Sequence, residues 1–168
     1  NPLGGAEAMK ELKRCRDELG FQGVVITSEQ DGRYLDAPEF DADRDQVLAR
    51  ARAAGVTRQV VPAVDAAGWP ALRALAASEP GVHPAYGLHP VFLARHRPED
   101  LAALPHWIEA ERPCAVGECG LDHFVPGLDP GAQARIFARQ LEIARDTGLP
   151  VIVHARREPV DRADESPL

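Results

Sequence analysis

The segment Pro113–Phe124, PCAVGECGLDHF, holds the residues whose types and spacing best suit chemistry. The apolar pair Ala115 and Val116 is typical of a buried parallel strand, and Glu118 lies at its carboxyl end. Parallel α/β folds place their reactive groups at that end of the strands. The glycines around Glu118 and Cys119 permit close approach of a metal or a substrate. A metal-binding carboxylate and a strand-end carboxylate that points into water fit this spacing equally well.

Other residues of metal-ligating types follow the neighbouring predicted strands. His89 follows the third strand, Asp122 follows the fourth, and His154 follows the fifth. Because parallel strands bring their carboxyl ends to one rim, we expect these side chains to converge with Glu118. Carboxylates and imidazoles are the ligands that zinc and other divalent first-row metals prefer. A bound metal would lower the pKa of a coordinated water and create a nucleophile near neutral pH. The alternative for His154 is a partnered strand-end histidine without a metal.

Alternating apolar runs and amphipathic segments predict the elements that must position these residues. The expected strands are residues 24–26, 58–64, 82–88, 114–119 and 149–153. The expected helices are residues 7–19, 41–54, 66–78, 98–111 and 130–147, the penultimate one irregular near Pro105. This order predicts an α/β fold of about five parallel βα units. The units form either a partial TIM barrel of the amidohydrolase-like kind or an open doubly wound parallel sheet.

Size and composition limit the classes of protein that fit. The 168 residues suit one domain, which we assign to residues 1–157, followed by a disordered tail at residues 158–168. The net charge of −7 opposes non-specific binding of nucleic acid. The odd number of cysteines, the lack of a membrane-spanning apolar stretch and the lack of a leader predict a cytoplasmic protein. An incomplete barrel would leave unpaired strand edges, which predict self-association into a homo-oligomer.

The cysteines offer weaker chemistry than the carboxylates and histidines. Cys114 and Cys119 are too far apart along one strand for a tight metal clip. No basic neighbour or helix start supports a lowered pKa for the Cys119 thiol. Two semi-buried small apolar side chains are therefore the favoured interpretation.

From about Leu35 to Arg157 the chain resembles the TatD-type metal-dependent deoxyribonucleases, which are amidohydrolase-like barrels. The resemblance lies in LDAPEFDADRDQVLARARAAGVTRQVVPAV, HPAYGLHP, AVGECGLDHF and LPVIVHARR. It implies a hydrolase that cleaves phosphodiester bonds, in DNA or in another phosphodiester substrate, with water activated by a divalent metal, Mg, Mn or Zn. It also implies that Glu118 is a bridging metal ligand, that His154 is a metal ligand and that His89 supports them. Asp122 is expected beside Glu118 as a catalytic residue.

The chain departs from the family's pattern at the first strand, which normally ends in a His-x-His-x-Asp signature. In register with LDAPEF, the two histidine positions fall on Gly32 and Tyr34, and only Asp36 is retained. The family also supplies a histidine and an aspartate from strands that follow the last residue of this sequence. Two ligands of a larger set remain, so we expect poor metal affinity and impaired hydrolysis.

The first forty residues carry a second resemblance, to the aminocarboxymuconate-semialdehyde decarboxylase-like amidohydrolases. It lies in ELKRCRDELGFQGVVI and DGRYLDAPEF, which resemble an inner helix and strand of those barrels and supply no metal ligand. We therefore predict a chimera in which residues 1–40 are decarboxylase-like and residues 40–157 are TatD-like. An inactive chimeric barrel fragment and a decarboxylase-like amidohydrolase are the alternatives to the hydrolase.

Overall fold

The computed structural model describes residues 10, 13–14, 17–18, 29–30, 33–34 and 44–157. The predicted strand at residues 24–26, Asp36 and the predicted tail at residues 158–168 lie outside them. In chain order the elements are β1 (Glu29–Gln30), β2 (Arg33–Tyr34), α2 (Arg44–Ala53), β3 (Gln59–Pro62), η2 (Ala66–Gly68), α3 (Trp69–Ser78), β4 (Val82–Tyr86), η3 (Pro90–Arg95), α4 (Pro98–Glu111), β5 (Ala115–Asp122), α5 (Pro130–Thr147) and β6 (Val151–Arg156).

The described strands form a parallel sheet of four strands and a separate antiparallel pair. The sheet has the order β3-β4-β5-β6, and β1 pairs with β2. Strand β5 pairs in parallel with β4 on one side and with β6 on the other. Helices alternate with these strands along the chain, which confirms the predicted α/β repeat. In the described sheet β6 is an edge strand whose Val153 is 54% exposed, and self-association through such an edge stays a prediction.

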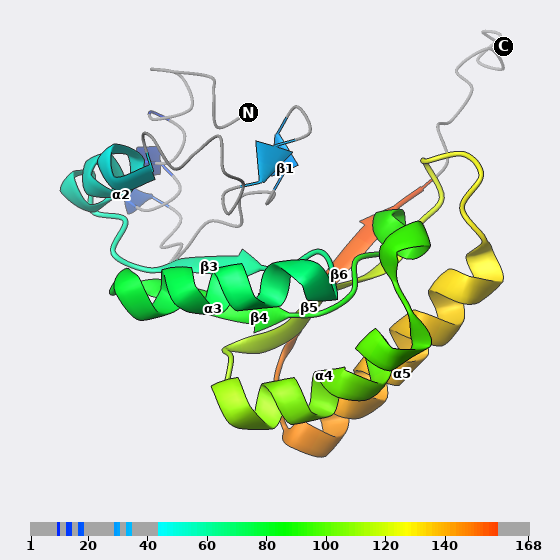
Figure 1. The fold of residues 1–168 in the computed structure, drawn as a ribbon. Helices are drawn as coiled ribbons and strands as arrows, with labels where there is room; N and C mark the ends of the chain where they lie inside the picture. Colours follow the sequence, from blue (N-terminus) through cyan, green and yellow to red (C-terminus); the bar gives the residue numbers. More distant parts are fainter. Residues whose placement is uncertain are drawn as a thin grey trace, which may run out of the picture. The chain divides into compact units, whose positions relative to one another are not determined.

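The chain divides into two compact units. One unit holds residues 1–61 and 70–84, and the other holds residues 62–69 and 85–168. In the second unit α5 packs on β5, and α4 lies beside α5 (Figure 1). The core of this unit consists of apolar side chains from the strands, from these two helices and from the segment after β4, among them Ala85, Leu88, Leu104, Val116, Ile143 and Ala144.

The ends of α4 and α5 lie where the sequence predicts them because capping residues fix them. Asp129 accepts hydrogen bonds from the backbone N–H groups of Gly131 and Ala132 at the start of α5. Gly148 ends α5 in the left-handed conformation, at φ +68°. Helix α4 continues through Pro105, the residue near which the sequence predicts an irregularity. A proline removes one intrahelical hydrogen bond, and packing of Leu104 and Ile108 in the core outweighs that loss.

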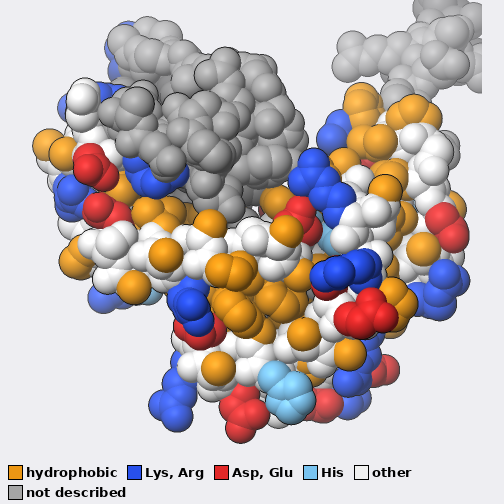
Figure 2. Space-filling model, in the orientation of Figure 1, with side chains coloured by type: hydrophobic (Ala, Val, Ile, Leu, Met, Phe, Trp, Pro, Cys, Tyr) orange, Lys and Arg blue, Asp and Glu red, His pale blue; other side chains and the backbone are white. Residues whose placement is uncertain are grey.

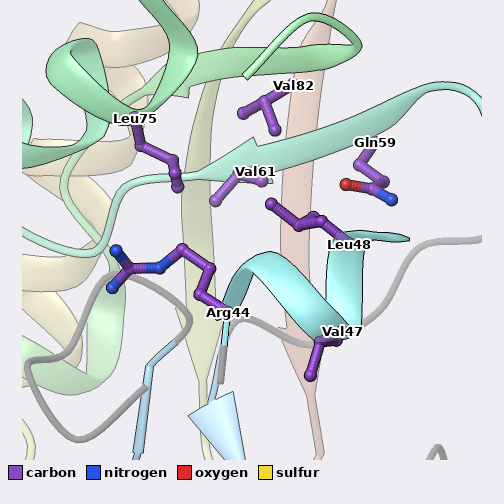
Figure 3. A pocket seen from close by; sticks show the side chains of 7 residues that line it. All are labelled: Arg44, Val47, Leu48, Gln59, Val61, Leu75 and Val82. Carbon is purple, nitrogen blue, oxygen red and sulfur yellow. The ribbon is translucent and has the colours of Figure 1, made fainter. Parts of the chain in front are cut away.

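In the first unit, side chains from α2, β3, α3 and β4 surround a small cavity (Figure 3). Val61, Leu75 and Val82 line it, and its volume is about 50 Å³. An apolar space of this size holds at most a few waters and is too small for a nucleotide. We therefore assign the cavity to imperfect packing.

Candidate functional site

Strand register in the second unit brings Glu118, Asp122 and His154 together. Glu118 and Asp122 are four residues apart in β5, so their side chains leave the same face of the strand. Gly120, midway between them, pairs with His154 of β6. The imidazole of His154 therefore reaches both carboxylates: its Nδ1 lies 3.1 Å from Glu118 Oε1, and its Nε2 lies 2.7 Å from Asp122 Oδ2. The expected convergence of Glu118 and His154 is thus observed, although His154 lies within β6 instead of after a strand.

Gly120 allows β6 to approach β5 at this point. Its φ is +149°, a conformation that residues with a side chain rarely adopt. A Cβ atom built on Gly120 would overlap the carbonyl oxygen of His154. Gly117 is similar, because at φ +146° its Cβ would lie 2.7 Å from the carbonyl oxygen of Ile152. These glycines permit the close approach of a neighbouring strand, whereas the sequence suggested the approach of a metal or a substrate.

His89 completes the cluster from the segment after β4. Its Nδ1 accepts a hydrogen bond from the backbone N–H of Val91, at 3.2 Å, and its Nε2 lies 3.5 Å from Glu118 Oε1. Its ring centroid is 4.4 Å from that of His154. One potential ligand atom from each of His89, Glu118 and His154 lies within 4.8 Å of the others. Among the described residues, this trio is the group that could hold a metal ion.

The charges of the cluster follow from these contacts. Burial acts to raise the pKa of Glu118, but hydrogen bonds with His154 and His89 outweigh it and lower the pKa to about 2. Burial likewise opposes ionisation of Asp122, yet hydrogen bonds from the N–H groups of Val125 and Phe124 and from His154 lower its pKa. Hydrogen bonding to Glu118, opposed by burial and reinforced by Asp122, raises the pKa of His154. The two carboxylates therefore bind one imidazole, which keeps its second proton to a higher pH than an ordinary histidine does.

Two buried glutamines of α5, which were not among the predicted site residues, fix the backbone around the site. Gln140 receives a hydrogen bond from the N–H of Leu88, at 2.8 Å, and donates one to the carbonyl of Leu88, at 3.1 Å. Gln133 makes the same two contacts with Asp122, at 2.6 and 2.9 Å. Each side-chain amide thus acts as a neighbouring peptide group would in a sheet. The signal in the sequence is their spacing of seven residues, which places two polar side chains on one helix face.

Gln140→Ala is expected to lower the free energy of unfolding by about 2 to 4 kcal/mol, because it leaves two buried backbone groups of Leu88 without partners. Urea unfolding measures the loss. Leu141→Ala is the control, because Leu141 follows Gln140 in α5 and is 41% exposed. We expect it to change the free energy of unfolding by less than about 1 kcal/mol. An equal, small effect of both substitutions would show that the amide does not fix the Leu88 backbone.

The other predicted site residues have different outcomes. Cys119 is fully buried, and burial together with the charge of Glu118 raises the pKa of its thiol to about 12, which argues against a reactive thiol. Cys114 is exposed, so the interpretation of two semi-buried side chains is wrong for both cysteines. The two differ because Cys114 precedes β5, whereas Cys119 lies in β5, which is paired with β4 and β6. Asp36 lies outside the described residues.

Known proteins match most of this chain. The family described as TatD related DNase matches residues 34–166. The chain belongs to this TatD-related family. A TatD relative in Escherichia coli K12, named an uncharacterized metal-dependent hydrolase YjjV, is 39% identical over 129 residues, 74% of this chain and 49% of the relative. A TatD protein of Erwinia billingiae, named a 3′-5′ ssDNA/RNA exonuclease, is 34% identical over 126 residues, 74% of this chain and 48% of that protein.

The fold agrees with a solved TatD homologue, the crystal structure of YjjV from Escherichia coli K12. The TM-score is 0.68 at 36% sequence identity, and the match covers 73% of this chain and 48% of that one. The four parallel strands with their helices therefore correspond to part of a TatD barrel. The chain spans about half the length of the curated relatives that it matches. These matches give no support to a decarboxylase-like origin of residues 1–40, so the chimera stays a prediction.

Proposed function

We propose that this chain is a TatD-type hydrolase that cleaves phosphodiester bonds of nucleic acid with water activated by a divalent metal. The observation that carries the proposal is the convergence of His89, Glu118 and His154 within 4.8 Å. The names of two relatives, a metal-dependent hydrolase and a single-stranded DNA and RNA exonuclease, support the same chemistry. The test is cleavage of a single-stranded oligonucleotide by the chain with added Mn²⁺, compared with the same mixture containing a chelator.

The donor set fits a divalent metal. Asp122, ionised because its pKa is lowered, accepts the hydrogen of Nε2 of His154 and so orients the ring. Nδ1 of His154 then faces Glu118, where a cation can replace the proton. In metalloproteins a ligating histidine commonly donates its other ring N–H to a carboxylate. When bound, a divalent metal supplies a nucleophilic water near neutral pH and a positive charge opposite the phosphoryl oxygen.

We assign the roles in this site from the hydrogen bonds. Glu118 and His154 are the proposed ligands, and Asp122 is a positioning residue that fixes the tautomer of His154. Nδ1 of His89 accepts from Val91, so its neutral ring carries the proton on Nε2, toward Glu118. His89 therefore suits a supporting donor to Glu118 better than a ligand, because ligation through Nε2 would require that proton to move.

The proposed site is weak, and its metal is Mg, Mn or Zn. The positions of the family's first-strand histidines carry Gly32 and Tyr34, which supply no imidazole ligand, and Asp36 is proposed as an additional group near the substrate. With two ligands and one supporting imidazole among the described residues, we propose low affinity and reduced hydrolysis. The replacement of the two histidines by Gly32 and Tyr34 also favours the alternative, an inactive fragment.

The charge distribution limits how a nucleic acid would be held. The net charge is −7, and on the face shown in Figure 2 the described basic and acidic side chains are interspersed instead of forming one basic patch. Long-range attraction of phosphates is therefore weak. A nucleic acid must be held by local contacts near the site.

The structure describes no helix long and apolar enough to cross a membrane.

Metal affinity should rise with pH across the range in which His154 loses its proton. The contacts with Glu118 and Asp122 raise the pKa of His154 above 6.5, so below this raised value a metal must displace the proton from Nδ1. We expect the affinity for Mn²⁺ to fall by about tenfold for each unit of pH below the raised pKa. Calorimetric titration between about pH 6 and about pH 8 measures the slope. An affinity that does not change in this range would exclude His154 as a ligand that must lose a proton.

A further inference from the structure

A row of side-chain contacts crosses the candidate metal centre and ends in a phenylalanine on each side. On one side the ring centroid of Phe92, in η3, lies 5.5 Å from that of His89. On the other side the guanidinium of Arg156 lies 3.7 Å from Asp122 and 4.1 Å from the ring centroid of Phe124. His154 joins the two halves, because it contacts both His89 and Asp122. An aromatic ring therefore lies at each end of the chain of contacts that includes the proposed ligands.

Each of these phenylalanines is paired with an exposed arginine. The guanidinium of Arg95 lies 4.8 Å from the ring centroid of Phe92, and the Arg95 side chain is 57% exposed. The Arg156 side chain above Phe124 is 45% exposed. Asp65 holds Arg95 at 3.1 Å, as Asp122 holds Arg156. The carboxylates fix the guanidinium groups in place while leaving donors free to face solvent.

Phe124 is not a core residue. It is 47% exposed, whereas Trp69 and Tyr86, which pack edge to face in the same unit, are 3% and 0% exposed. Packing alone explains the buried pair but not an aromatic ring left half in solvent beside a guanidinium. Phe92 is partly exposed. Accessible aromatic rings beside arginines are a common means of binding single-stranded nucleic acid, because every base has a face that stacks and every phosphate accepts from a guanidinium.

We propose that Phe92 with Arg95 and Phe124 with Arg156 form two subsites that hold a single-stranded nucleic acid across the metal centre. The rings take bases, and the guanidinium groups take the adjoining phosphates. This inference rests on the proposed hydrolase function and specifies how the substrate is bound. It also explains how a protein with a net charge of −7 can hold a polyanion, since most of the binding then comes from stacking instead of long-range attraction.

The test is binding of a fluorescent oligothymidylate to the full chain, measured by anisotropy in the presence of a chelator so that no metal contributes. Phe92→Ala and Phe124→Ala are each expected to weaken binding by about fivefold or more. An abasic oligonucleotide, which retains its phosphates, should bind both variants as it binds the parent chain. Leu141→Ala, which removes a 41% exposed apolar side chain from α5, is the matched control and should bind like the parent.

The arginines are tested by salt dependence. Arg95→Ala and Arg156→Ala should each weaken binding of both oligonucleotides and reduce the slope of log affinity against log salt by about 0.7. Arg139→Ala is the control, because Arg139 is similarly exposed on α5 and pairs with Glu142. Phe124→Leu keeps the apolar bulk and should lose affinity like Phe124→Ala, whereas Phe124→Trp should retain it. The two variants separate stacking from folding.

The results distinguish the subsites from the hydrolase. The subsites are overturned if the parent chain does not bind oligothymidylate, or if both phenylalanine variants bind it as the parent does. They are also overturned if the phenylalanine variants lose affinity for the abasic strand as much as for oligothymidylate. Phenylalanine-dependent binding without metal-dependent cleavage supports the subsites and rejects the hydrolase. Cleavage together with binding that ignores both phenylalanines rejects the subsites alone.

Discussion

Replacement of Glu118 by Gln is expected to weaken binding of Mn²⁺ by a factor of about 100 or more and to abolish metal-dependent cleavage. Glu118 supplies the only carboxylate of the candidate trio, and with a pKa of about 2 it is ionised throughout the neutral range. Glutamine keeps the shape of the side chain but removes the charge. Calorimetric titration of the parent and the variant measures the difference.

The control for this substitution is Glu142→Gln. Glu142 is an exposed glutamate on α5 whose partner is Arg139, so its replacement removes one charge at the surface without touching the cluster. We expect it to leave Mn²⁺ affinity within about twofold of the parent, since exposed charges are screened. Equal affinities of the parent and the Glu118→Gln variant would reject the metal centre.

Gly120→Ala is expected to prevent the native fold of the second unit or to destabilise it by at least about 3 kcal/mol. The backbone at Gly120 has a φ of +149°, and the added Cβ would overlap the carbonyl oxygen of His154. Relief of the overlap requires β5 and β6 to separate at the pair that positions His154 between its carboxylates. Urea unfolding and the amount of soluble protein measure the effect.

Gly127→Ala provides the matched comparison. Gly127 also has a positive φ, +81°, but nothing lies within 4 Å of the position that its Cβ would take. We expect a loss of about 1 to 2 kcal/mol from the unfavourable conformation alone. If both variants lost the same stability, the close approach of β6 to Gly120 would not be what requires a glycine there.

The sequence predicts the helices of the second unit well because their ends depend on local chemistry. The prolines and the capping Asp129 at the starts, and Gly148 at the end of α5, act within a few residues of themselves. Strand ends depend on neighbours instead. β5 was expected to stop at Cys119 but continues to Asp122, because it pairs with β6 as far as Arg156. The sequence suggests that the glycine after Cys119 admits a metal or a substrate, whereas in the structure it permits close strand packing.

In the candidate site, too, some features follow from local residue types and others from strand pairing. The residue types at strand ends predict that Glu118, Asp122, His89 and His154 gather at one rim of the sheet. The pairing of Gly120 with His154, which sets one imidazole between two carboxylates, depends on strand register and is not readable from spacing. Gln133 and Gln140 were missed because their partners lie 11 and 52 residues away in the chain.

The most direct measurement is anomalous diffraction from crystals of the chain grown with zinc or manganese. The proposal predicts a peak bonded to a carboxylate oxygen of Glu118 and to Nδ1 of His154, at about 2.0 to 2.2 Å from each for zinc. Asp122 should remain hydrogen-bonded to the opposite nitrogen of that ring. Metal peaks confined to exposed carboxylates elsewhere, with Glu118 still bonded to His154, would contradict it.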